Sequence, residues 1–159
     1  LLSEPKHGYE VFQEFSRELG RVWRVGQSQL YAQLKLLEES GLVSVRIEEQ
    51  PNRPARKVYR LTPEGRAAFE EWVHQPTPYL RRIRVEFLAR LYFFQRLSLD
   101  GLDELVSGQK AVCRDQIARF DRLMADTEEP FAHLVLEFRR GQLEAVVRWL
   151  DRCPEHLLP

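Results

Sequence analysis

The sequence has few cysteines and no long apolar run. Cys113 and Cys153 are too few for a disulfide framework. Neither belongs to a CxxC motif or a basic cluster, so we expect buried or half-buried thiols rather than a redox switch. No run of 18 apolar residues occurs, so no membrane span is predicted. Leu1 and Leu2 do not begin a signal peptide and read as the tail of a truncated helix. A cytoplasmic globular protein of one or two domains is predicted.

The chain also lacks any recognisable catalytic or metal-binding pattern. Four histidines are scattered, with no HExxH spacing between them: His7, His74, His133 and His156. No Gly-rich phosphate loop or GxSxG motif is present. Glu38 and Glu39 are neighbours on a predicted helix and therefore face different ways. The sequence predicts no enzyme activity, no metal and no cofactor.

Net charge is absent as well, with 24 basic and 24 acidic residues. A zero balance argues mildly against a nucleic-acid binder. The distribution is uneven, however, because residues 21–60 hold eight basic and four acidic side chains, an excess of +4. That local excess predicts salt-sensitive but not tight non-specific binding to nucleic acid.

What the sequence does contain is a helix followed directly by a two-stranded ribbon. The helix is predicted from Gln27, with Leu30, Leu34 and Leu37 on one apolar stripe and a stop at Gly41. An earlier helix is expected to end at Gly20. Alternation over 42–47 and 57–61 predicts two strands around a Pro-rich turn at 50–55. This layout is typical of a winged helix, which places a helix in the major groove and a cationic hairpin beside it.

Only helices are predicted after the ribbon. Thr62, Pro63 and Glu64 form a helix start, and the QPTPY segment at 75–79 is a linker. Three further helices are expected over 81–97, over 102–127 and from Pro130 onward. The predicted fold is mainly α with a small β-hairpin wing. Its domains are a winged helix-turn-helix over 1–75, with its first helix truncated, and an α-helical dimerisation domain over 76–159.

The last helix is apolar on two sides, whereas a helical hairpin can bury only one. We therefore predict that this helix is a dimerisation arm and that the protein is a homodimer. The alternative is packing against the N-terminal domain of the same chain. The predicted dimerisation residues are Phe120, Leu134, Phe138, Leu143, Val147, Trp149 and Leu150.

Three segments resemble the PadR family of bacterial winged-helix transcriptional regulators. They are HGYEV at 7–11, SQLYAQLKLLEESGLV at 28–43 and RKVYRLTPEGRAAFEEW at 56–72. The resemblance implies a bacterial regulator, most often a repressor, that binds an imperfect palindromic operator as a homodimer. Some members of the family bind small aromatic or drug-like effectors. The chain departs from the family at Ala32, where Pro is common, and at Leu36, where a basic residue is common.

Candidate DNA contacts follow from the winged-helix reading. On the recognition helix they are Gln27, Ser28, Gln29, Tyr31 and Lys35. At the tip of the wing they are Arg53, Arg56 and Lys57. Gln can bridge adenine N6 and N7, Ser and Tyr hydroxyls can reach bases or phosphates, and Arg suits a narrow minor groove. Two other functions stay open: a winged helix that binds protein, which zero net charge and Leu36 favour, and a ligand-capturing sensor.

Overall fold

The chain divides into an N-terminal unit, Leu1–Val73, and a helical unit, His74–Pro159. The computed structural model describes residues 1–20, 22–50 and 53–157, without the side chains of Gln50, Arg53, Pro54 and His156. The structure is mainly helical with one small antiparallel sheet, which confirms the predicted fold class. The DNA-binding and dimerisation roles of the two parts remain predictions.

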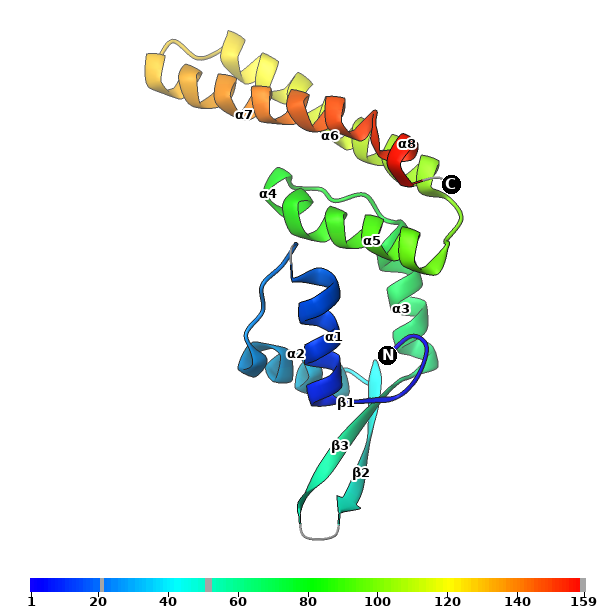
Figure 1. The fold of residues 1–159 in the computed structure, drawn as a ribbon. Coiled ribbons are helices and arrows are strands. Elements are labelled where there is room, and N and C mark those ends of the chain that lie inside the picture. Colours follow the sequence, from blue (N-terminus) through cyan, green and yellow to red (C-terminus); the bar gives the residue numbers. More distant parts are fainter. Residues whose placement is uncertain (21, 51–52, 158–159) are drawn as a thin grey trace. The chain divides into compact units, whose positions relative to one another are not determined.

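The N-terminal unit combines three helices with a three-stranded sheet (Figure 1). Its elements are β1 (Lys6–His7), α1 (Gly8–Leu19), α2 (Gln27–Glu39), β2 (Val43–Gln50), β3 (Arg53–Leu61) and α3 (Pro63–His74). The strands lie in the order β1-β3-β2, and both pairings are antiparallel. Leu30, Leu34, Val43 and Tyr59 form the buried core that joins α2 to the sheet.

The buried side of α2 is shorter than the sequence predicts. Leu30 and Leu34 lie one turn apart and are buried, but Leu37 is 37% exposed. The predicted stripe is therefore wrong at its last member, because the described core does not cover the final turn of the helix. The helix ends as expected, since Gly41 has a φ of +71°, a left-handed conformation that favours glycine.

The wing strands are longer than predicted, which changes the place of the basic residues. β2 extends to Gln50 and β3 begins at Arg53, so Arg53 and Arg56 lie within a strand rather than in a turn. The alternation rule missed this because Pro54 interrupts the pattern. In the strand register, Glu48 lies opposite Arg56 and Gln50 lies opposite Arg53. Two residues of β3, Pro54 and Ala55, therefore lie opposite a single residue of β2, Glu49. A proline, which lacks an N–H, is tolerated at such a bulge.

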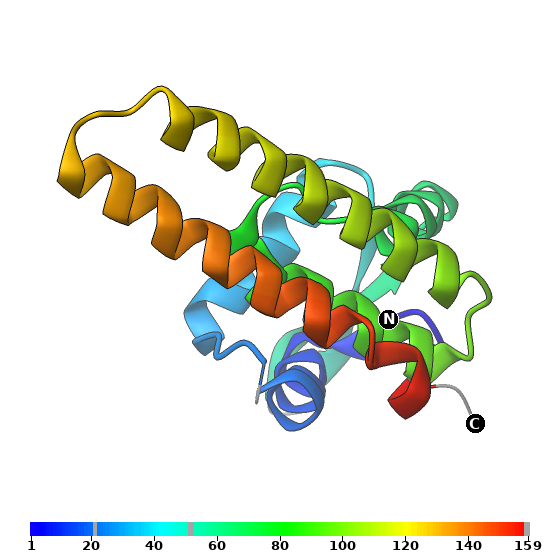
Figure 2. The same ribbon diagram turned by 90° about the horizontal axis from the view of Figure 1, so that it is seen from above.

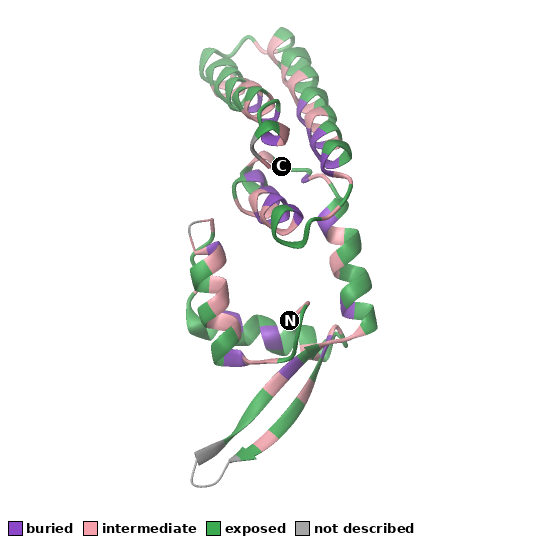
Figure 3. Ribbon diagram, turned by 45° about the vertical axis from the view of Figure 1, so that its right-hand side comes forward, coloured by how far each residue is buried: buried purple, intermediate pink, exposed green. Residues whose placement is uncertain are grey.

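Burial decreases along the outer part of the wing (Figure 3). Val43 is 3% exposed, Val45 is half-buried and Ile47 is 65% exposed, although all three alternate on one face of β2. The hairpin therefore extends past the core, where its side chains are available to a partner.

Strand β1 was not predicted, because the segment EPKHG at 4–8 reads as a break. Lys6 pairs with Tyr59 and His7 with Val58 on β3. A strand of two residues has too little period to detect from sequence. The Lys6 ammonium donates to Glu14 at 2.7 Å, which ties this strand to α1.

The helical unit contains a π-helical segment that the sequence pattern did not predict. Its elements are α4 (Leu80–Arg82), the π-helix η1 (Ile83–Phe87), α5 (Leu88–Leu97), α6 (Leu102–Ala125), α7 (Pro130–Leu150) and α8 (Cys153–Leu157). The single helix expected over 81–97 is thus α4, η1 and α5 in succession. Pro130 begins α7 as predicted, and the Glu129 carboxylate caps it by accepting from the Phe131 N–H at 2.9 Å.

Helices α6 and α7 lie side by side as a hairpin (Figure 2). Leu105, Gln109, Cys113, Leu143 and Leu150 are among its most buried side chains. The linker lies against this hairpin through hydrogen bonds between Thr77 and Gln109. The Gln109 side chain accepts from the Thr77 N–H at 2.6 Å and donates to the Thr77 carbonyl at 2.9 Å. Within the described part of the chain, no helix is long and apolar enough to cross a membrane.

Candidate nucleic-acid interface

The first turn of α2 presents polar side chains that the core does not use. Gln27, Ser28 and Gln29 are all exposed, while Leu30, next in sequence, is buried and fixes the rotation of the helix. Gly26 is the N-cap, and no side chain caps the helix there. The free N–H groups of this turn are therefore available to an anion such as a phosphate.

Tyr31 lies directly against the start of α1. A Cβ atom at Gly8 would be 2.6 Å from Cε1 of Tyr31, closer than atoms normally approach. Glycine at this position therefore allows the ring to approach the backbone of α1 while Tyr31 stays 37% exposed. This contact links two of the sequence motifs, HGYEV and SQLY, in space.

The two predicted lysine contacts are exposed but engaged in ion pairs. Lys35 lies 3.6 Å from Glu39, with 74% of its side chain exposed. Lys57, on β3, lies 3.3 Å from Glu38 of α2. Surface pairs of this kind contribute roughly 0–1 kcal/mol, so a phosphate could replace either acid at small cost.

The basic residues of the wing lie along its strands. Arg56 is exposed, and in the strand register it lies opposite Glu48, while Lys57 lies opposite Ile47. The Arg53 side chain lies outside the described residues. Arg46, 77% exposed, forms an ion pair with Glu48 on its own strand. The predicted wing cations therefore belong, where described, to the stem of the hairpin and not to its tip.

A hollow of about 630 Å³ lies between the start of α1, Tyr31 and β3. Its lining includes Tyr9 and Gln13, which the sequence analysis did not single out, together with Arg56 and Lys57. Tyr9 is 54% exposed. Tyr9 lies in the HGYEV motif, which is the sequence signal that could have pointed to it. The motif does not show, however, that the start of α1 and strand β3 line the same hollow.

No chemistry beyond binding emerges from the described residues. No group of three His, Cys, Asp or Glu side chains among them could hold a metal ion. Cys113 and Cys153 are free and buried, as predicted. Burial raises the pKa of Cys153 to about 11, which leaves its thiol protonated and unreactive near neutral pH.

The predicted dimerisation residues fall into separate groups. Leu143 and Leu150 are 0% exposed within one chain, so their side chains cannot contact a second copy; they belong to the hairpin core. Leu134 and Phe138 are 59% and 65% exposed. The remaining three, Phe120, Val147 and Trp149, are half-buried. Phe131, one turn before Leu134, is 70% exposed and was missed.

Comparison with known proteins decides the family. Residues 1–71 match the Transcriptional regulator PadR-like family, and residues 83–157 match the Virulence activator alpha C-term family. The negative transcriptional regulator PadR of Bacillus subtilis is 31% identical over 157 residues, which cover 91% of this chain and 85% of that protein. This chain belongs to the PadR-like family. A probable transcriptional regulator of Mycobacterium tuberculosis is 32% identical over 76 residues, covering 48% of this chain and 40% of the relative.

Two solved structures match almost the full length of this chain. B. subtilis PadR in complex with operator DNA has a TM-score of 0.46 and 24% identity, covering 94% of this chain and 88% of that one. The Vibrio cholerae virulence activator AphA has a TM-score of 0.42 and 28% identity, covering 99% and 92%. The family and its named members are transcriptional regulators rather than enzymes, in agreement with the sequence prediction.

Proposed function

We propose that this PadR-like protein is a transcriptional repressor that binds an imperfect palindromic operator as a homodimer. The observation that carries the proposal is the exposed, uncapped first turn of α2 on a helix whose opposite side is locked into the core. The relative from B. subtilis is named a negative regulator, which supports repression.

In the proposed complex, α2 enters the major groove by its N-terminal end. Gln27, Ser28 and Gln29 reach base edges there, because recognition helices of this type read bases from their first turn. Tyr31 and Lys35 contact the phosphate backbone at the groove edge. Phosphate contacts fix the register of the helix, whereas the glutamines supply sequence preference.

The wing contributes a second set of backbone contacts. Arg56 and Lys57 are exposed on β3, and Arg53 is the residue proposed to enter the adjacent minor groove. The bulge at Pro54 and Ala55, opposite Glu49, increases the local twist of the hairpin. The wing thus adds backbone contacts through Arg56 and Lys57 and a minor-groove contact through Arg53 that depends on groove width rather than on base edges.

The second copy is proposed to pack on the exposed apolar stripe of α7. Phe131, Leu134 and Phe138 recur at spacings of three and four residues and so share one side of the helix. Phe120, Val147 and Trp149 are proposed to contribute at the edge of this interface. Pairing two arms sets the distance between two winged-helix heads, and a small-molecule effector that changes this distance would release DNA.

Base readout is tested with Gln29→Ala on a duplex selected by the wild-type protein. Loss of a bidentate contact should cost roughly 1–3 kcal/mol of discrimination at one base pair of each half-site and leave other positions unchanged. Gln95→Ala, an exposed glutamine on α5, is the control and should change nothing. An unchanged base preference for Gln29→Ala would contradict this part of the proposal.

The dimer is tested by light scattering on Phe138→Glu and His133→Glu. Both positions are exposed on α7, but His133 lies away from the apolar stripe. A charge placed in the interface should give a monomer, whereas the control should remain a dimer. A dimer for both variants, or a monomer for the wild type, would refute dimerisation through the apolar stripe of α7.

A protein-binding winged helix is the second candidate function. Leu36 on α2 is 52% exposed and Ile47 on β2 is 65% exposed, and neither helps to bind a phosphate. Under that alternative Arg56→Ala and Lys35→Ala leave retention on DNA unchanged. The repressor reading requires both variants to lose affinity and to show a shallower salt dependence.

A further inference from the structure

The acidic side chains of the α2 and wing segment lie beside its cations. Residues 21–60 contain four acids, which are Glu38, Glu39, Glu48 and Glu49. The Glu39 carboxylate lies 3.6 Å from the Lys35 ammonium on α2, and the Glu38 carboxylate lies 3.3 Å from the Lys57 ammonium on β3. Both lysines that are proposed to contact DNA phosphates are therefore paired with a glutamate from the last turn of α2.

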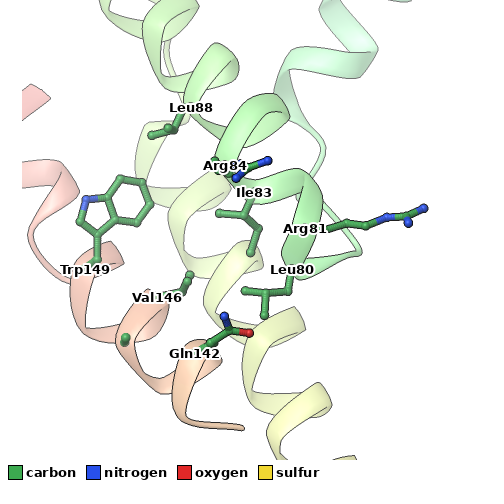
Figure 4. A pocket seen from close by; sticks show the side chains of 9 residues that line it. Leu80, Arg81, Ile83, Arg84, Leu88, Gln142, Val146 and Trp149 are labelled. Atoms are coloured by element: carbon green, nitrogen blue, oxygen red, sulfur yellow. The ribbon is translucent and has the colours of Figure 1, made fainter. Parts of the chain in front are cut away.

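Pairing with an acid is not general among the exposed cations of this chain. Arg81 and Arg84 of the helical unit are exposed and line a hollow of about 590 Å³, and the described residues that line it include no acid (Figure 4). Equal numbers of acidic and basic residues in the sequence therefore do not place an acid beside every cation. The two ion pairs of α2 need a separate explanation.

The two glutamates occupy the end of α2 where a negative charge is least favourable. The helix ends at Glu39, with no basic residue in its last turn. The C-terminal end of a helix carries a partial negative charge, so a carboxylate there is destabilising. The Lys35–Glu39 pair also has the weaker orientation, because i,i+4 pairs are stronger when the glutamate precedes the lysine. Helix stability therefore does not account for the two glutamates.

The charges of α2 differ between its two ends. At Gly26 no side chain caps the helix, so the first N–H groups favour a phosphate. At the other end the helix dipole and the carboxylates of Glu38 and Glu39 disfavour one. Gln27 and Glu39 lie about 18 Å apart along the helix axis. A duplex that approaches the last turn of α2 is therefore repelled, whereas one that approaches the first turn is attracted.

We infer that Glu38 and Glu39 determine specificity for the operator, an inference that rests on the proposed DNA-binding function. In the operator complex Lys35, one turn nearer to the first turn of α2 than Glu39, lies between that carboxylate and the DNA backbone, and Lys57 does the same for Glu38. In a complex in which the duplex meets the last turn of α2, phosphates lie next to the carboxylates and are repelled. The glutamates therefore lower the affinity for unrelated duplex more than the affinity for the operator.

The test is fluorescence anisotropy at low salt with two labelled duplexes. One is a duplex selected by the wild-type protein from random DNA, and the other is a scrambled duplex of the same length and base composition. The double variant Glu38→Gln/Glu39→Gln should bind the scrambled duplex about tenfold tighter, because each charge about 6 Å from a phosphate in water corresponds to about threefold in affinity. Its affinity for the selected duplex should rise by less than about threefold, so the ratio of the two affinities falls.

Two matched variants separate the charge and its position from other effects. Glu38→Asp/Glu39→Asp keeps both carboxylates and should keep the wild-type ratio. Asp121→Asn/Asp151→Asn also removes two paired carboxylates, which lie 2.6 Å from Arg140 and 2.5 Å from Lys110 in the helical unit, and should leave the ratio unchanged. A thermal melt of each variant checks that the chain remains folded.

The salt dependence gives a second measurement. The difference in ratio between the wild type and Glu38→Gln/Glu39→Gln should shrink as salt rises, because the screening length falls from about 10 Å at 0.1 M to about 3 Å at 1 M. A difference that does not change with salt would contradict repulsion by the carboxylates.

The inference alone is overturned if the wild type prefers its selected duplex but Glu38→Gln/Glu39→Gln keeps the wild-type ratio. It is also overturned if the ratio falls only because the selected duplex binds more weakly, or if Asp121→Asn/Asp151→Asn lowers the ratio equally. A wild type that prefers no duplex would overturn the proposed function together with the inference, so the two failures are distinguishable.

Discussion

Replacing Lys35 by alanine should lower DNA affinity and reduce its salt dependence without unfolding the protein. Lys35 has 74% of its side chain exposed and makes one ion pair with Glu39 at 3.6 Å. An i,i+4 pair on a helix surface contributes about 0.2–0.5 kcal/mol, so the loss of stability is small. The effect on DNA is larger because each phosphate neutralised in the complex releases counterions.

The magnitude follows from the number of contacts. Each neutralised phosphate contributes about 0.9 to the slope of log affinity against log salt on duplex DNA. A homodimer presents two copies of Lys35, so Lys35→Ala should make the slope shallower by about 1.8. Fluorescence anisotropy of a labelled duplex, measured at several salt concentrations, gives this slope directly.

Lys110→Ala is the matched control. Lys110 also forms a lysine–carboxylate ion pair, with Asp151 at 2.5 Å, but it belongs to the helical unit. The control removes the same charge from the chain, and its slope should equal that of the wild type. Equal slopes for Lys35→Ala and Lys110→Ala would refute the assignment of α2 to the DNA backbone.

Three further predictions concern the N-terminal unit. Gly8→Ala should displace the Tyr31 ring and weaken DNA binding, because the new Cβ would lie 2.6 Å from Cε1 of Tyr31; unchanged DNA affinity would contradict this prediction. Leu34→Ala, at a side chain 3% exposed, should cost about 2–5 kcal/mol in guanidinium unfolding, and a loss below about 1 kcal/mol would show that the site is not core. The hydrogen bond from Lys6 lowers the pKa of Glu14 below its ordinary 4.5. The Lys6–Glu14 pair therefore stabilises the folded state above pH 4.5, and this contribution is lost as the pH falls through the lowered pKa of Glu14. Lys6→Met should remove this part of the acid dependence of the melting temperature, and an unaltered pH profile would argue against the pair.

Local patterns in the sequence predicted the main helices and the wing because those signals are short-range. Leu30 and Leu34 follow the helical period, Pro130 follows a capping residue, and Gly41 ends α2 in a left-handed conformation. Each of these features depends on neighbours within a few residues. The positions of α2 and of α7 could therefore be predicted without a structure.

Features that depend on contacts between distant segments could not be predicted. The pairing of β1 with β3 joins residues about fifty positions apart, and two residues have no detectable period. Arg56 was expected at the wing tip because Pro54 reads as a breaker, whereas a bulge accommodates Pro54 and leaves Arg56 within β3. Apolar periodicity also could not separate Leu143, which is buried in the hairpin, from Phe138, which is exposed.

The most direct test of DNA recognition is selection of random duplex DNA by the purified protein at near-physiological salt. The proposed homodimer should enrich sequences containing two inverted half-sites whose centres lie about one helical turn, roughly 34–36 Å, or a multiple of it apart. Failure to enrich any duplex over a scrambled competitor would contradict the claim that α2 and the wing form an operator-binding surface.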